Sequence, residues 1–112
     1  MFYHLIVYVP VGAANSVRDA MASAGAGRIG KYDSCSFSSR GTGRFRPLKG
    51  ANPAIGDIGS LEEVEEERIE AVVKAEDLKN VLKAITDVHP YEEPAIHVLR
   101  MEDCHDLLGR RV

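Results

Sequence analysis

Hydrophobic residues in this chain recur first with the spacing of a strand and then with that of a helix. Residues 2–9 alternate loosely and are rich in Tyr, Ile, Leu and Val, which predicts a half-buried strand ended by Pro10. From Val17 to Ala24 the apolar residues recur at intervals of three and four, which predicts a helix that stops near Gly25. The chain therefore opens with a strand followed by a helix.

The next segment has the composition of extended chain interrupted by turns. Between residues 31 and 47, aromatic residues flank Gly41-Thr42-Gly43, which predicts either a hairpin that folds back at the glycines or one bent strand. Residues 49–60 contain several glycines and prolines but no periodic apolar set, which predicts a loop with defined turns.

Residues 64–74 carry conflicting signals, because their glutamates favour a helix while their apolar residues alternate as in a strand. We predict a strand, since a clear amphipathic helix follows from Leu78 to Val88 and alternation of strand and helix builds a compact sheet. Pro90 disfavours helical geometry at His89, so this helix is expected to end there.

A final strand is predicted over residues 95–101, with Ile96 and Val98 on one face. The order β-α-β-β-α-β is that of the ferredoxin-like sandwich, an α+β fold whose antiparallel sheet carries both helices on one face. We assign residues 1–101 to this domain and 102–112 to a C-terminal extension. The uncovered face of the sheet must meet water or another subunit.

The composition argues against nucleic acid and membranes as partners. The chain has 112 residues, 45% of them hydrophobic, and a net charge of -3, with no basic cluster beyond Arg110-Arg111, which argues against nucleic acid. The apolar opening segment is too short to span a bilayer and lacks a cleavage site, so we expect a cytoplasmic protein without a membrane partner. Cys35 and Cys104 are expected to be reduced thiols.

The glycine tract matches a familiar motif in the wrong place. Gly25, Gly27 and Gly30 satisfy the dinucleotide fingerprint G-x-G-x-x-G, but they follow a helix instead of opening one. We interpret them as turn and close-packing positions. The stretch from Gly41 to Arg44 offers backbone N–H groups and a guanidinium to an anion, although a plain hairpin tip is the simpler interpretation.

The block His89-Pro90-Tyr91-Glu92-Glu93-Pro94 concentrates polar chemistry between two prolines. Imidazole and carboxylate are ordinary ligands for zinc and its neighbours, so His89 and Glu93 are candidate metal ligands, joined by Cys35 if its strand lies beside the last one. Because neighbouring residues of a strand point to opposite faces, Glu92 and Glu93 cannot share an ion without a bulge.

The competing interpretation of this block is structural. His89 then caps the preceding helix, one glutamate pairs with Arg68 or Arg44, and Tyr91 packs between subunits.

The remaining polar groups have simple explanations. Cys104-His105, with Asp103 and Asp106, has adjacent donors, so a closed tetrahedral site would need a second chain and an exposed tail is favoured. His4 and His97 are expected to be structural unless their strands bring them together. The acidic run at 62–67 predicts solvated sheet surface. No serine or cysteine has a base at motif spacing, so we expect a protein that is not an enzyme.

Residues 2–100 resemble the small domain inserted into the YqfO proteins, a branch of the NGG-one-interacting-factor-three-like family. The matching pieces are GAGRIG at 25–30, YDSCSF at 32–37, GTGRFRP at 41–47, NPAIG at 52–56, ERIE at 67–70 and HPYEEP at 89–94. The resemblance implies a fold akin to the signalling protein PII and the divalent-cation-tolerance protein CutA, which assemble as trimers with clefts between subunits. The two-metal centre of the larger relatives lies in flanking domains whose motifs have no counterpart here.

These observations lead to two hypotheses. The first is a homotrimer that binds a small ligand or a divalent metal, zinc or copper, in clefts between subunits. The second is an interaction domain that regulates a separate YqfO-type dinuclear metal hydrolase. The candidate ligand-binding residues are Tyr32, Cys35, Arg44, Tyr91 and Glu92, and the candidate metal ligands are Cys35, His89 and Glu93.

Overall fold

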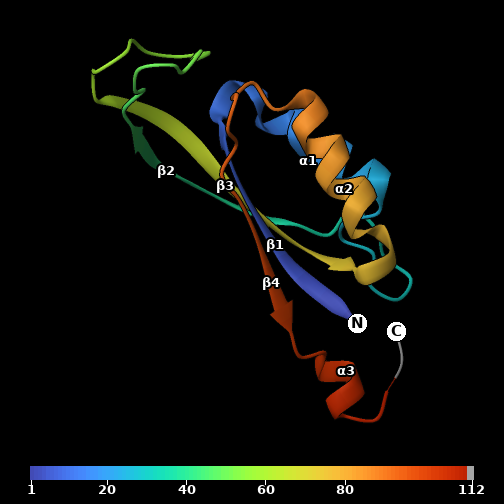
Figure 1. Cartoon of the computed structure of the whole chain (residues 1–112). Coiled ribbons are helices and arrows are strands. Elements are labelled where there is room, and N and C mark those ends of the chain that lie inside the picture. Colours follow the sequence, from blue (N-terminus) through green and yellow to red (C-terminus); the bar gives the residue numbers. More distant parts are fainter. Residues whose placement is uncertain (111–112) are drawn as a thin grey trace.

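The computed structural model describes residues 1–110 and contains one antiparallel sheet with two long helices on one face (Figure 1). Residues 111–112, the end of the predicted extension and of the Arg110-Arg111 pair, lie outside the described residues. The elements in chain order are β1 (Phe2–Pro10), the short 3-10 helix η1 (Val11–Ala13), α1 (Ala14–Ala24), β2 (Phe37–Phe45), β3 (Glu62–Lys74), α2 (Ala75–Val88), β4 (Ile96–Met101) and α3 (Cys104–Leu107).

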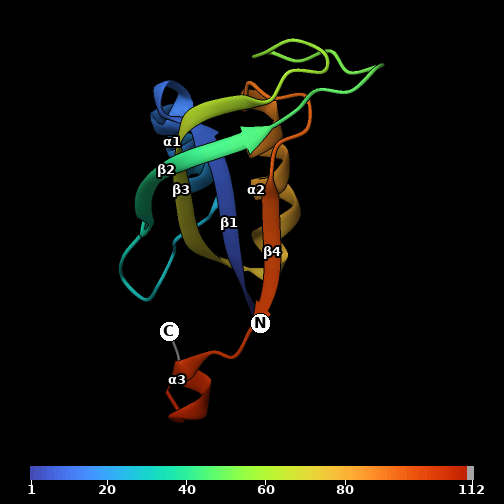
Figure 2. The same cartoon turned by 90° about the vertical axis from the view of Figure 1, so that its left-hand side faces the viewer.

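The sheet has the strand order β2-β3-β1-β4, and each neighbouring pair is antiparallel. This arrangement confirms the α+β, ferredoxin-like fold predicted from the alternation of strand and helix. Both α1 and α2 lie on the same side of the sheet, and its other side carries no helix in the part of the chain that the structure describes (Figures 1 and 2). Within residues 1–110, no helix is long and apolar enough to cross a membrane.

The core lies between the two central strands and the helices. Leu5 and Val7 of β1 pair with Ala71 and Ile69 of β3, and all four side chains are buried. The segment 64–74 is therefore a strand, as predicted, because burying its alternate apolar residues outweighs the helix propensity of its glutamates. The helices close this core with buried residues on one stripe each: Val17 and Met21 from α1, and Val81 and Ile85 from α2.

The glycine hairpin predicted near residue 42 is wrong, and the single-strand alternative is correct. Gly41 and Gly43 lie inside β2, opposite Glu66 and Val64 of β3. The chain reverses later, in the loop over residues 46–61, which projects past the end of the sheet (Figure 2). A Cβ atom at Gly43 would collide with the Glu66 carboxylate, so this glycine makes room for a side chain of the neighbouring strand.

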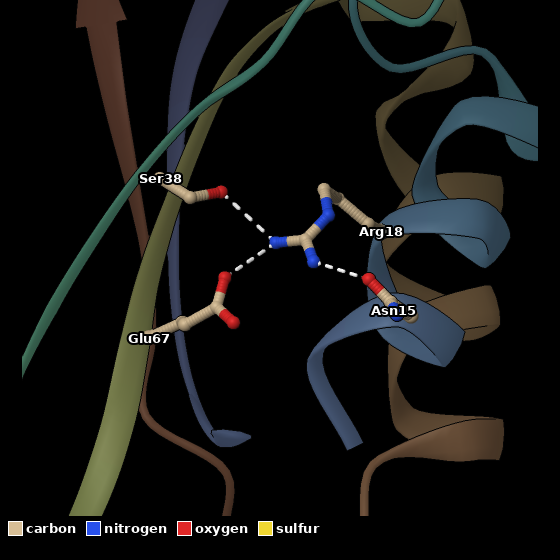
Figure 3. Close-up of polar contacts among 4 residues, drawn as sticks. All are labelled: Asn15, Arg18, Ser38 and Glu67. Atoms are coloured by element: carbon tan, nitrogen blue, oxygen red, sulfur yellow. Dashed lines mark hydrogen bonds and ion pairs between the residues drawn. The ribbon is translucent and has the colours of Figure 1, made fainter. Parts of the chain in front are cut away.

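The acidic run is not uniformly solvated surface, which corrects the prediction for residues 62–67. Glu66 and Glu67 are each only 9% exposed, and they point to opposite faces of β3. Glu67 faces α1, where Arg18 Nη1 donates to Glu67 Oε1 over 2.6 Å and to Ser38 Oγ over 3.0 Å. Arg18 Nη2 also donates to Asn15 Oδ1 over 2.6 Å (Figure 3). This arginine therefore ties α1 to both β2 and β3.

The glycine tract after α1 forms turns that pack against the sheet, as predicted. Gly27 adopts a φ of 78°, its N–H donates to Val72 O over 2.8 Å, and its carbonyl accepts from Cys35 N over 3.0 Å. A Cβ atom here would collide with the Cys35 backbone. The segment after the helix is thus fastened to the sheet through one glycine.

The residues after β4 turn away from the domain. They form α3, which lies beyond the end of the sheet (Figures 1 and 2). The tail predicted from the sequence is therefore partly helical. Asp103 caps the helix by accepting a hydrogen bond from His105 N over 2.9 Å.

Candidate functional site

A cavity of about 480 Å³ lies where β2 leaves the sheet, between the projecting loop and the segment that precedes β4. Its floor is the sheet itself, and the loop covers it from one side. The lining is mostly apolar but includes acidic and basic side chains. It comprises Tyr8, Gly43, Arg44, Phe45, Arg46, Pro47, Leu48, Ala51, Pro53, Ala54, Ile55, Glu66, Tyr91, Glu92, Glu93 and Ala95. Such a combination suits a small organic ligand held by a few polar contacts.

A hydrogen bond between a phenol and a buried carboxylate forms part of the cavity wall. Tyr91 Oη donates to Glu66 Oε2 over 2.9 Å, and the ring of Phe45 packs edge-on against Tyr91 with 5.6 Å between ring centroids. Burial raises the pKa of Tyr91 well above its usual range, and the hydrogen bond to Glu66 and its negative charge raise it further. Tyr91 is therefore a neutral donor aimed at a carboxylate.

His89 holds the backbone of Tyr91 in place. Its Nδ1 accepts from Tyr91 N over 3.1 Å, so its Nε2 carries the proton and donates to Tyr8 O over 2.7 Å. The ring is buried, and both nitrogens are engaged. His89 also caps α2, as expected from the sequence: it is the C-cap residue, and its backbone N–H donates to Ile85 O.

The two glutamates of the proline-flanked block both line the cavity. Residues 90–95 lie outside β4 and form bends, so the strand geometry that was expected to separate Glu92 from Glu93 does not apply. Glu92 Oε1 accepts from Asn52 N over 3.0 Å and so fastens the projecting loop to this block. Neither glutamate pairs with Arg44 or Arg68, which instead pair with Glu63 and Glu70.

Three of the predicted ligand-binding residues thus meet at one cavity, and two do not. Arg44, Tyr91 and Glu92 line it, together with the metal candidate Glu93. Tyr32 is exposed in a turn where it bonds to Ile29, and Cys35 borders a separate hollow beside α1. Within one copy of the chain, therefore, Cys35 does not meet His89 or Glu93.

The two strand histidines have different partners. His4 Nε2 lies 3.0 Å from Glu70 Oε1, whereas the His97 ring packs edge-on against Tyr8 with 5.6 Å between centroids. Although β1 and β4 are neighbours, each histidine thus contacts a residue other than the second histidine.

Sequence reasoning missed Glu66 and Phe45 as cavity residues. Both belong to strands whose pairing register decides what they face, and no local pattern reports that register. The one available signal was Gly43, whose missing side chain leaves space for Glu66.

We expect the Tyr91 interaction to give a distinct alkaline transition. The folded pKa of Tyr91 lies above that of an unfolded tyrosine, about 10, so its contribution to stability is complete below that pH and is lost as pH rises above it. The free energy of unfolding in urea should therefore fall more steeply above about pH 10 in the wild type than in Tyr91→Phe. If the free energy of unfolding fell equally steeply with pH in the two proteins, this assignment would be contradicted.

Comparisons with known proteins place the chain among longer bacterial relatives. It is 45% identical over 107 residues to a GTP cyclohydrolase 1 type 2 homolog of Halalkalibacterium halodurans, covering 96% of this chain and 29% of that protein. It is 44% identical in sequence to a solved Bacillus cereus protein related to NIF3, with a TM-score of 0.80 over 91% of this chain and 26% of the other. The chain therefore spans less than a third of the length of these relatives.

A more distant likeness concerns the fold alone. The divalent cation tolerance protein of Thermus thermophilus superposes with a TM-score of 0.67 at 17% identity, over 97% of this chain and 93% of the other. No protein-family model matches the sequence. The chain is therefore homologous to one domain of these longer proteins, among them the Bacillus cereus protein related to NIF3, and it shares the fold of the CutA proteins.

Proposed function

We propose that this chain is a non-enzymatic binding module whose ligand occupies the cavity around Tyr91, and that three copies assemble so that the cavity lies in a cleft between subunits. The observation that carries this proposal is the Tyr91–Glu66 pair, a neutral donor and a carboxylate placed together in a mostly apolar cavity. A small molecule with one hydrogen-bonding end and an apolar body suits this lining.

Assembly is supported by the surfaces that one chain leaves uncovered. The sheet face opposite the helices exposes Phe37 and Leu99, and β2 and β4 are edge strands with free backbone groups. Tyr32 and Cys35 lie outside the cavity of their own chain, so in this proposal they reach a cleft from a neighbouring subunit. A cytoplasmic location is part of the same proposal.

A divalent metal, zinc or copper, is the other occupant that fits the proposal. Glu92 and Glu93 supply carboxylates to the cavity, and Cys35 of a neighbouring subunit would supply a thiolate. His89 would join them only by giving up its bond to Tyr8 or to Tyr91.

Native mass spectrometry tests both halves of the proposal on one untagged preparation. At micromolar concentration the expected mass is three times that of the chain, and a monomer would contradict the cleft. Bound zinc, copper or a co-purified small molecule would appear as added mass. Gly43→Ala should lower the occupancy of the bound metal or small molecule about 10-fold, because the new methyl group displaces the Glu66 carboxylate.

The matched control is Gly41→Ala, on the same strand and with no atom within 4 Å of the added methyl group. It should leave occupancy unchanged. Equal occupancy in both variants would place the ligand elsewhere.

A second candidate function is regulation of a separate YqfO-type metal hydrolase. It is favoured by the length comparison, because relatives carry this domain as 29% of a longer protein. Co-purification with a YqfO-type protein, combined with an empty cavity, would support this second function over the first.

A further inference from the structure

Three metal-ligating groups of different chemistry converge at the start of α3, away from the cavity. His105 Nδ1 lies 3.3 Å from Asp103 Oδ1 and 3.7 Å from Cys104 Sγ. All three donor atoms lie within 4.8 Å of one another, and no other group of three or more such residues among residues 1–110 comes as close to forming a site. In Figure 1, α3 follows the far end of β4, at the opposite end of the sheet from the projecting loop that covers the cavity.

The two short distances match the edges of a tetrahedral zinc site. Zinc bonds to sulfur at about 2.3 Å and to nitrogen or carboxylate oxygen at about 2.0–2.2 Å. At the tetrahedral angle of about 109°, these bond lengths give a sulfur–nitrogen separation of about 3.5 Å and a nitrogen–oxygen separation of about 3.3–3.5 Å. The values of 3.7 Å and 3.3 Å in the structure are close to these two separations, and the third pair of donor atoms lies within 4.8 Å.

Local structure already orders two of the three groups. The Asp103 side chain is 14% exposed, and its Oδ1 is held by the backbone N–H of His105 at 2.9 Å. The same oxygen keeps a second lone pair, and the other carboxylate oxygen is also available to an ion. Cys104 is exposed and next in sequence, so binding would order a single additional side chain.

We propose that Asp103, Cys104 and His105 form a three-ligand site for a zinc-class divalent ion, with its fourth position open to water. A thiolate and an imidazole select zinc and related transition metals over magnesium or calcium, which prefer oxygen ligands. The site is independent of the cavity around Tyr91, so it stands or falls separately from the proposed function.

Titration of the reduced, full-length protein with cobalt(II) and zinc tests this site. We expect a thiolate-to-cobalt charge-transfer band that saturates at one equivalent per chain and is displaced by zinc, with proton release as the thiol ionises. Cys104→Ser should abolish the band and weaken zinc binding by at least about 100-fold. Both titrations are made in a Cys35→Ser background, which removes the other free cysteine and with it the thiolate proposed for the cavity, so that the band reports on Cys104 alone.

A second pair of variants separates metal binding from helix capping. Asp103→Asn keeps an effective N-cap but loses the negative charge, so it should preserve α3 while weakening zinc binding about 10- to 100-fold. Asp106→Asn removes the same charge from a residue outside the three-ligand group and should have little effect. The proposal is overturned if no cobalt or zinc binds at millimolar concentration, if the band survives in Cys104→Ser, or if the two asparagine variants bind zinc equally.

Discussion

Gly27→Ala is expected to destabilise the protein by about 3 kcal/mol or more. Gly27 has a φ of 78°, where an alanine costs about 1–2 kcal/mol. Its new methyl group would also collide with the Cys35 backbone, which must move and break hydrogen bonds at Gly27 that each contribute about 1 kcal/mol. Urea unfolding followed by circular dichroism should show the loss as a lower midpoint with an unchanged slope.

The matched control is Gly50→Ala. Gly50 also has a positive φ, 98°, but no atom lies within 4 Å of the added methyl group. Gly50→Ala should therefore lower the free energy of unfolding only by the conformational cost of about 1–2 kcal/mol. If Gly27→Ala and Gly50→Ala lose the same free energy, the close approach between Gly27 and Cys35 contributes nothing to stability.

Arg18→Met is expected to lower the free energy of unfolding by about 2 kcal/mol. The substitution removes the guanidinium that pairs with Glu67 while leaving the carboxylate in a largely buried position (Figure 3). The Arg18 and Glu67 side chains are 27% and 12% exposed, so water compensates the stranded charge in part and the loss falls below the 3–5 kcal/mol typical of a fully buried pair.

Two further variants test this explanation. Arg44→Met breaks an ion pair with Glu63 whose side chains are 57% and 60% exposed, and it should change stability by less than about 0.5 kcal/mol. Combining Arg18→Met with Glu67→Gln should recover much of the loss, because the second change removes the buried charge. Equal effects of Arg18→Met and Arg44→Met would show that burial of Glu67 does not matter.

The candidate site was only partly accessible to sequence reasoning. The block from His89 to Pro94 was found from its composition, because two prolines and four polar side chains in six residues are conspicuous in any context. Its partner Glu66 was hidden within a run of glutamates that looks uniformly polar. Their meeting depends on β3 lying beside β1 and on the turn that brings residues 90–95 back over the sheet.

The predicted metal ligands show that residue type alone does not bring ligands together. Cys35, His89 and Glu93 are suitable ligands by type, but Cys35 is held at Gly27, while His89 is held at Tyr8 and Tyr91. The donors that do converge in one chain, Asp103, Cys104 and His105, are adjacent in sequence, where a capped turn suffices to bring them together.

The order of the four strands and the two long helices followed from the sequence alone, because hydrophobic period and helix-ending prolines and glycines act over a few residues. The tertiary structure alone decided which glutamates are buried, whether Gly41 and Gly43 end a strand or continue it, and which polar side chains share a cavity. These outcomes depend on the register between strands distant in sequence, and a shift of one residue would reverse every face.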